Sequence, residues 1–166
     1  LSLVGDQRWI VQEMIVSRVR DGRTFDVQIH THKDGRGKWA LVRSYVGLSE
    51  AGKLAPHSSH GGFQGDLGKV LANLGDDSVA LAARIKRLGL QVSETLDAQY
   101  DGSLDELGIG ILIDPQHRPW IAGVTSRPAS HFHEYDRARP RVGYALHLAR
   151  RFGSEAHQNT SRFARS

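Results

Sequence analysis

Two pairs of histidines have the residue type and the spacing that could support metal chemistry. His30 and His32 stand two residues apart in an alternating segment, and His131 and His133 form a second His-x-His pair. Imidazole suits zinc, nickel and copper, so the four side chains could hold such an ion if the two pairs converged. The alternative is that histidines at this spacing simply line an exposed polar strand face. The spacing fixes no third ligand, and no metal site is assigned from it.

A second set of polar residues could bind a small ligand. The segment from residue 25 to residue 32 alternates, so Asp26 and Gln28 should share the polar face of the two histidines. His57 and His60 precede two glycines, and a glycine-rich backbone can cradle phosphate, although a flexible surface loop explains the same residues. The possible ligand-binding residues are Asp26, His30, His32, His57, His60 and Arg127.

Several catalytic patterns are absent from the sequence. There is no cysteine, which excludes disulfides, thiolate catalysis and cysteine-based zinc sites. There is no Gly-x-Ser-x-Gly elbow, and the Walker and Rossmann glycine patterns are missing. Paired carboxylates such as Glu134 with Asp136, or Asp105 with Glu106, are expected to be solvated.

The positive charge is concentrated near the C-terminal end. The 166 residues carry a formal net charge of +4, and eight arginines face only three acidic residues from Arg127 onward. A basic region containing Arg137, Arg139 and Arg141 can attract an acidic partner, whereas surface charge often serves only solubility. Because aromatic residues do not alternate with the basic ones, nucleic-acid binding is not favoured.

Length and composition predict one ordinary globular domain. The sequence is 39% hydrophobic and 24% charged, and no apolar run approaches the roughly 18–20 residues of a membrane helix. No signal-peptide pattern opens the chain, so a cytoplasmic location is expected. The chain begins at Leu1 without an initiator methionine, and we expect that it is a fragment or a processed piece.

Hydrophobic periodicity predicts the elements that position these residues. Apolar or alternating runs predict strands at 9–16, 25–32, 39–46, 107–113 and 120–124. Apolar residues spaced three and four apart predict a long helix, capped within 76–78 and running to residue 96. The other predicted elements are a glycine-rich loop over 48–74 with a short helix near 67–74, and an amphipathic helix over 142–152.

This order of elements predicts an α+β fold, in which an antiparallel sheet has helices packed on one face. Residues 1–152 are expected to form a single domain. Residues 153–166 are expected to form a flexible tail of polar and basic character.

Five motifs in order resemble ATP-grasp proteins, and more narrowly the spore-coat-associated YheC/YheD group. IVQEMI at 10–15 precedes DGRTFDVQ at 21–28, which resembles DGRPFDxR, and SHGG at 59–62 stands where the group has a loop ending in two glycines. ELGIGILID at 106–114 resembles ELGIDIGID, and WIAGVTSRP at 120–128 resembles WLIEVNSKP. The match runs from about Arg8 to Pro128 and implies the C-terminal half of an ATP-grasp module.

The resemblance implies a carboxylate–amine ligase that uses ATP and magnesium, but four positions depart from it. It places an Asp at Gly110, a Glu at Gly123, an Asn at Thr125 and a phosphate-contacting Arg at Gln28. Magnesium prefers carboxylate oxygens, and glycine has no side chain to offer. We therefore expect a degenerate, non-catalytic subdomain without a cofactor, whose role is structural, regulatory or partner-binding.

Two alternatives stay open at this point. The chain could be the C-terminal half of a working ATP- and magnesium-dependent ligase whose N-terminal half is supplied by other residues. It could also be a basic module that binds an anionic partner. The expected partners are a second copy of the chain, through the polar strand face or a sheet edge, or the missing N-terminal half. The resemblance implies a spore-associated location.

Overall fold

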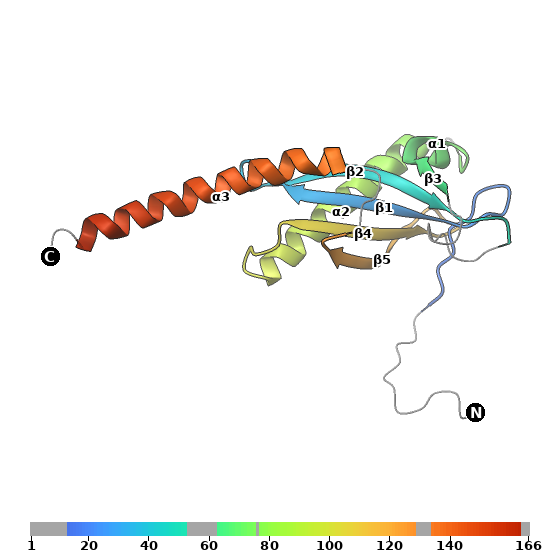
Figure 1. Cartoon of the computed structure of the whole chain (residues 1–166). Helices are drawn as coiled ribbons and strands as arrows, with labels where there is room; N and C mark the ends of the chain where they lie inside the picture. Colours follow the sequence, from blue (N-terminus) through green and yellow to red (C-terminus); the bar gives the residue numbers. More distant parts are fainter. Residues whose placement is uncertain (1–12, 53–62, 76, 129–133, 164–166) are drawn as a thin grey trace, which may run out of the picture.

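A five-stranded antiparallel sheet forms the centre of the molecule (Figure 1). The computed structural model describes residues 13–52, 63–75, 77–128 and 134–163. The strand order is β3-β2-β1-β4-β5, with β1 at Phe25–Lys33, β2 at Trp39–Leu48, β3 at Phe63–Asp66, β4 at Glu106–Ile113 and β5 at Pro119–Ser126. The helices are α1 at Leu67–Ala72, α2 at Ser78–Gln99 and α3 at Glu134–Phe163. The predicted α+β class is confirmed.

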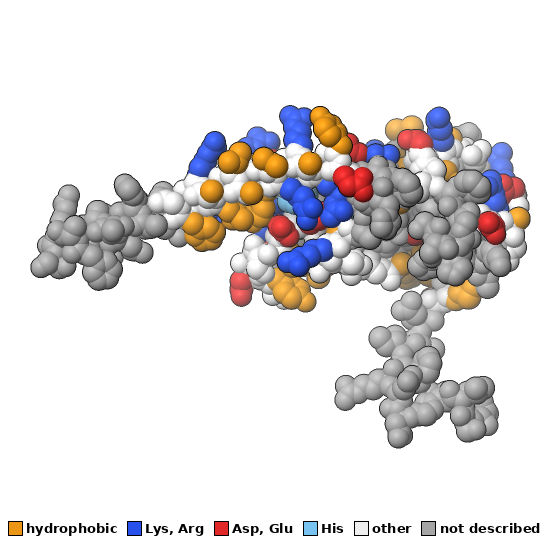
Figure 2. All heavy atoms as spheres, viewed as in Figure 1, with side chains coloured by type: hydrophobic (Ala, Val, Ile, Leu, Met, Phe, Trp, Pro, Cys, Tyr) orange, Lys and Arg blue, Asp and Glu red, His pale blue; other side chains and the backbone are white. Residues whose placement is uncertain are grey.

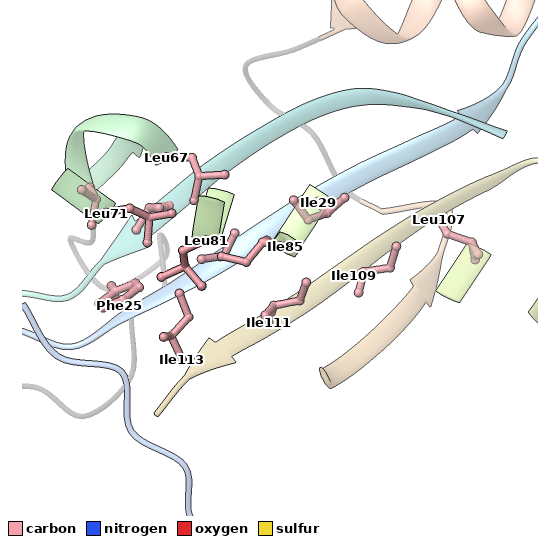
Figure 3. Close-up of a cluster of buried hydrophobic side chains, with 13 residues drawn as sticks. Phe25, Ile29, Leu67, Leu71, Leu81, Ile85, Leu107, Ile109, Ile111 and Ile113 are labelled. Carbon is pink, nitrogen blue, oxygen red and sulfur yellow. The ribbon is translucent and has the colours of Figure 1, made fainter. Parts of the chain in front are cut away.

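The core lies between the sheet and two helices, α1 and α2. Alternate residues of the two central strands point to this side, and they meet apolar side chains of α1 and α2 (Figure 3). The labelled members of this cluster are Phe25, Ile29, Leu67, Leu71, Leu81, Ile85, Leu107, Ile109, Ile111 and Ile113. Their burial drives the packing of α1 and α2 on one face of the sheet.

Helix α2 lies unusually close to strand β1. A Cβ atom on Gly89 would stand 2.6 Å from Cγ2 of Ile29, so only glycine fits at this point of the helix. One turn further on, the hydroxyls of Thr31 and Ser93 are 2.7 Å apart and both residues are fully buried. The glycine that lowers helix propensity therefore permits the close approach of helix and strand.

Helix α3 begins over the other face of the sheet. Arg137 contacts Glu106 of β4, and the ring of Tyr144 packs edge-on against His32 of β1. Asp136 accepts a hydrogen bond from Arg43 of β2 at 2.7 Å. The helix then continues away from the sheet, so its C-terminal part projects from the body of the molecule (Figure 1).

The sequence located most elements, with four differences. Strand β3 lies within the segment predicted to be a loop, where it pairs with the end of β2. Residues 13–16 form no strand, and residues 9–12 of that predicted strand lie outside the described residues. Asp77 is the N-cap of α2 but makes no side-chain capping hydrogen bond.

The fourth difference concerns the length of α3. This helix starts at Glu134 and ends at Phe163, so the predicted limits of 142 and 152 were wrong at both ends. Pro140 lies inside the helix, where it lacks the N–H that would bond to the carbonyl of Asp136. The helix therefore tolerates one missing hydrogen bond near its start. The domain boundary at residue 152 and the flexibility of the tail stay predictions.

Candidate functional site

Strand register brings the four altered family positions together on one face of the sheet. Gln28 of β1 pairs with Gly110 of β4, which pairs in turn with Gly123 of β5. Two residues before Gly110 in β4, Gly108 pairs with Thr125 of β5. Directly paired residues point to the same side, and a Cβ on Gly110 would stand 3.5 Å from Nε2 of Gln28. The four positions therefore lie on one sheet face, opposite α1 and α2, and their role as a functional site stays a prediction.

The centre of this face carries one carboxylate, one amide and one phenol. The side-chain amide of Gln28 donates a hydrogen bond to the carboxylate of Asp26. Tyr45 of β2 pairs with Gln28 from the other side. Burial raises the pKa of Tyr45, and the negative charge of Asp26 raises it further while Arg43 partly opposes the shift. Tyr45 is therefore a neutral phenol at physiological pH.

Sequence reasoning missed Tyr45 because a bulge changes the hairpin register. The β1–β2 pairing starts with Lys33 opposite Trp39, and an irregularity between His30 and Thr31 shifts it by one residue. Without that shift Ser44 would stand opposite Gln28. The hairpin itself was visible in the sequence, but the extra residue in β2 carried no local signal that distinguished it.

The donor groups on this face do not fit a magnesium ion. Gly110 and Gly123 offer no side-chain oxygen, and a Cβ on Gly123 would meet nothing within 4 Å. Asp26 is engaged by Gln28, and Glu106 at the far end of the face is engaged by Arg137 and Arg141. Among residues 13–52, 63–75, 77–128 and 134–163 no group of three or more His, Cys, Asp or Glu is placed to hold a metal.

The two histidines of β1 are buried, so the expectation of an exposed polar face was wrong for this part of the strand. His30 is 2% exposed and packs edge-on against Tyr45, and His32 is 1% exposed beside Tyr144. The cover comes from residues distant in sequence, which a strand pattern cannot reveal. His131 and His133 lie outside the described residues, and the four-histidine metal site stays untested.

The buried His32 ring is oriented by the neighbouring backbone. Its Nδ1 stands 2.7 Å from the carbonyl oxygen of Lys33, an arrangement in which the ring N–H donates. Its Nε2 has no hydrogen-bond partner among the described residues. The next residue, Lys33, points to the other side of the strand, where Nζ contacts Asp97 at 2.8 Å.

Pro128 closes part of the face beside His30. A Cβ on Gly108 would stand 2.6 Å from Cβ of Pro128, which is buried although it follows the exposed edge strand β5. The preceding Arg127 is exposed and has a φ of +57°, an uncommon backbone for a residue other than glycine. At Arg127 the chain therefore turns from β5 toward the sheet face that carries Gly108. His57 and His60, the other candidate ligand residues, lie outside the described residues.

The basic cluster of α3 is partly committed to internal contacts. Arg137 donates to both carboxylate oxygens of Glu106, at 2.5 and 2.9 Å, and its side chain is only 12% exposed. Arg141 lies 3.6 Å from the same carboxylate. One of the three arginines expected to attract an anionic partner is therefore neutralised by Glu106. Glu106 is buried, which corrects the expectation that it is solvated.

A cavity of about 540 Å³ lies apart from the four family positions, between residues 13–20 and the β4–β5 loop. Asp114 organises this loop: the indole of Trp120 and the guanidinium of Arg118 donate to its carboxylate, as do two backbone amides. Burial raises the pKa of Asp114, but these hydrogen bonds lower it by more, so the carboxyl titrates well below its usual range. The cavity lining includes none of the four family positions.

Comparison with known proteins agrees with the motifs. The sequence matches the YheC/D like ATP-grasp family over residues 1–149. It is 31% identical over 110 residues to the endospore coat-associated protein YheD of Bacillus subtilis (strain 168). That alignment covers 64% of this chain and 23% of the relative, which fits the C-terminal half of an ATP-grasp module. No helix in the described part of the chain is long and apolar enough to span a membrane. The chain belongs to the YheC/D-like ATP-grasp family.

Proposed function

We propose that this chain is a degenerate ATP-grasp subdomain that keeps the fold and has lost the ability to bind magnesium–ATP. Its role would be structural, regulatory or partner-binding, and it would need no cofactor. The observation that carries the proposal is the set Gln28, Gly110, Gly123 and Thr125 on one sheet face, where the family pattern has charged or metal-binding groups.

The energetic argument follows from what phosphoryl chemistry requires. Such reactions depend on positioning and on neutralisation of phosphate charge by metal ions and cations. Removing one preorganised group commonly costs about 2.7–4 kcal/mol of transition-state stabilisation. Here two glycines replace carboxylates, and the amide of Gln28 is already hydrogen bonded to Asp26. Losses at several positions together leave no basis for efficient catalysis on this face.

Isothermal titration calorimetry with ATP tests the proposal on the 166-residue chain. We expect no magnesium-dependent heat at protein concentrations of tens of micromolar. A parallel titration of ATP with EDTA separates metal-dependent binding from simple attraction of phosphate to surface arginines. Micromolar affinity that requires magnesium would overturn the proposal.

A second candidate is the C-terminal half of a working ATP-dependent ligase. The observation that favours it is coverage: the aligned segment spans 23% of the curated relative, so most of that protein's length lies outside the match. A longer protein that includes the residues upstream would then release ADP when given carboxylate and amine substrates. Absence of ADP release from the longer protein would remove this candidate and leave the first.

We also propose that the chain acts at the spore. The supporting observation is that the relative is described as endospore coat-associated. Fractionation of spores from the source organism, followed by immunodetection of the chain, would test this location. Recovery only from vegetative cytoplasm would contradict it.

A further inference from the structure

The first part of strand β2 is an open edge of the sheet. Strand β3 pairs with β2 only from Tyr45 to Leu48, so the stretch from Trp39 to Ser44 has no neighbouring strand on that side among the described residues. An unpaired edge presents backbone N–H and C=O groups that can pair with another extended chain. The edge is therefore a place where a strand from a partner can be added.

The register identifies the backbone groups that face the open edge. The amide of Asp34 donates to the carbonyl of Lys38 at 2.8 Å, so these two residues are a hydrogen-bonded pair of the hairpin. Hydrogen-bonded and non-hydrogen-bonded pairs alternate in an antiparallel ladder, so Ala40 is the next residue of β2 that bonds to β1. The amides and carbonyls of Trp39 and Leu41 therefore point outward, to the open edge.

A groove of about 790 Å³ runs along this edge, between β2 and helix α3. Ala40, Leu41 and Val42 form the β2 wall, and residues of α3 between Tyr135 and Leu146 form the opposite wall. This α3 wall is about 17 Å long, which equals the length of about five residues of extended chain. The groove therefore has the dimensions of one added strand.

Two contacts hold α3 at a fixed position beside β2. Asp136 accepts a hydrogen bond from Arg43 at 2.7 Å. Further along the helix, a Cβ on Gly143 would stand 3.3 Å from the backbone of Gly35, so the two backbones nearly touch. The walls of the groove are therefore formed before any partner arrives, which lowers the entropic cost of binding.

Large apolar side chains of α3 are exposed in this groove. Val142 is 60% exposed and Leu146 is 52% exposed, and both line the groove. Hydrophobic side chains are visible along α3 in Figure 2. Alternate side chains of a strand added to β2 would point toward the helix, because strand side chains alternate between the two sides. Apolar side chains at those positions would remove this surface from water.

Charge in the groove favours an acidic occupant. Arg139 lines the groove and is exposed, and its guanidinium makes no ion pair within the described part of the chain. By contrast, both carboxylates that line the groove have cationic partners, Asp136 in Arg43 and Asp34 in Arg36. A carboxylate on the occupant would therefore be complementary to the groove.

We infer that an extended, acidic segment of a partner protein binds in this groove as an added strand. Its backbone pairs with the outward groups of Trp39 and Leu41. Its alternate apolar side chains contact Val142 and Leu146, and a carboxylate pairs with Arg139. The inference specifies the partner-binding role in the proposed function and rests on that proposal.

A synthetic peptide tests the inference on the 166-residue chain. The probe is fluorescein-labelled Glu-Thr-Val-Thr-Val-Thr-amide, and fluorescence anisotropy should show saturable binding. Val142→Asp and Arg139→Glu should each weaken binding at least about tenfold, with unchanged far-ultraviolet circular dichroism. Val79→Asp is the control, because Val79 is 82% exposed on α2, and it should bind as the wild type does. No saturable binding up to millimolar protein, or binding that survives Val142→Asp, would overturn the inference.

Amide hydrogen exchange tests the strand pairing itself. The bound peptide should slow exchange at Trp39 and Leu41, while Ala40, which already bonds to β1, should change little. Unchanged exchange at Trp39 and Leu41 would overturn the inference. Light scattering that shows a dimer dissociated by the peptide would assign the groove to a second copy and would also overturn it. Titration of the same protein with magnesium–ATP tests the proposed function separately, so the two can fail independently.

Discussion

The carboxylate of Glu106 on β4 and the guanidinium of Arg137 on α3 form a buried two-pronged ion pair, with N···O distances of 2.5 and 2.9 Å. The Glu106 side chain is 3% exposed. This contact fixes the start of α3 on the sheet face that carries the four altered family positions. It also covers the end of the face where His32 lies opposite Glu106.

Breaking this ion pair should destabilise the protein strongly. Arg137→Met leaves the Glu106 carboxylate buried without its main partner, which should lower the free energy of unfolding by about 3–5 kcal/mol. The double variant Glu106→Leu with Arg137→Met removes both charges and should recover most of that loss. Urea unfolding followed by circular dichroism measures both. Equal stability of the Arg137→Met and wild-type proteins would show that α3 is not held by this contact.

Two glycines in helices should respond in opposite ways to alanine. Gly89→Ala places a methyl group 2.6 Å from the buried Ile29 side chain and should lower the free energy of unfolding by about 1–3 kcal/mol. Gly153→Ala meets nothing within 4 Å and should increase local helix stability by up to about 1 kcal/mol. Thermal unfolding and amide hydrogen exchange in α3 measure these effects. A stabilising Gly89→Ala would contradict the close approach of α2 and β1.

Gly110 and Gly123, where the motif resemblance predicts carboxylates, should accept side chains. Gly123→Glu points into open space and should change the free energy of unfolding by less than about 0.5 kcal/mol. Gly110→Asp meets only ordinary contacts and should also give a folded protein. Gly108→Ala is the contrasting variant, because its Cβ would overlap Pro128, and it should cost about 1–3 kcal/mol. Equal stability of all three variants would contradict the described packing of this face.

Asp114 should make stability depend on pH in the acidic range. Its folded-state pKa is lowered, so its contribution is complete above the unfolded pKa of about 3.9 and is lost as pH falls toward the folded value. The free energy of unfolding of the wild type should therefore fall below about pH 4 more steeply than that of Asp114→Asn. Urea unfolding at several pH values measures the slopes. An unchanged slope in Asp114→Asn would refute the assignment.

The sequence predicted the parts of the fold that depend on local periodicity. The alternation around Val27 and the apolar spacing around Ile85 located β1 and α2, because burial on one face imposes these repeats. Strand β3 was missed because its four residues are strand-like only through pairing with β2. The early start of α3 was missed because Pro140 interrupts the helical pattern.

The same distinction applies to the candidate site. The sequence placed Gln28, Gly110 and Gly123 in strands, and pairing of these strands brings the three residues to one face. That they correspond to family site positions stays a prediction. The burial of His30 and His32 could not be predicted, because their cover comes from Tyr45, Pro128 and the first turns of α3. Such long-range contacts depend on register and on chain reversal, neither of which leaves a local pattern.

Backbone amide NMR of Gly110 and Gly123 during a titration with magnesium–ATP tests the absence of a metal–nucleotide site most directly. Both amides lie where the motif resemblance predicts metal-binding carboxylates, so a metal–nucleotide bound there would shift their resonances. We predict that magnesium–ATP causes no larger shift at these glycines than ATP with EDTA. Saturable, magnesium-dependent shifts at both glycines would contradict the account.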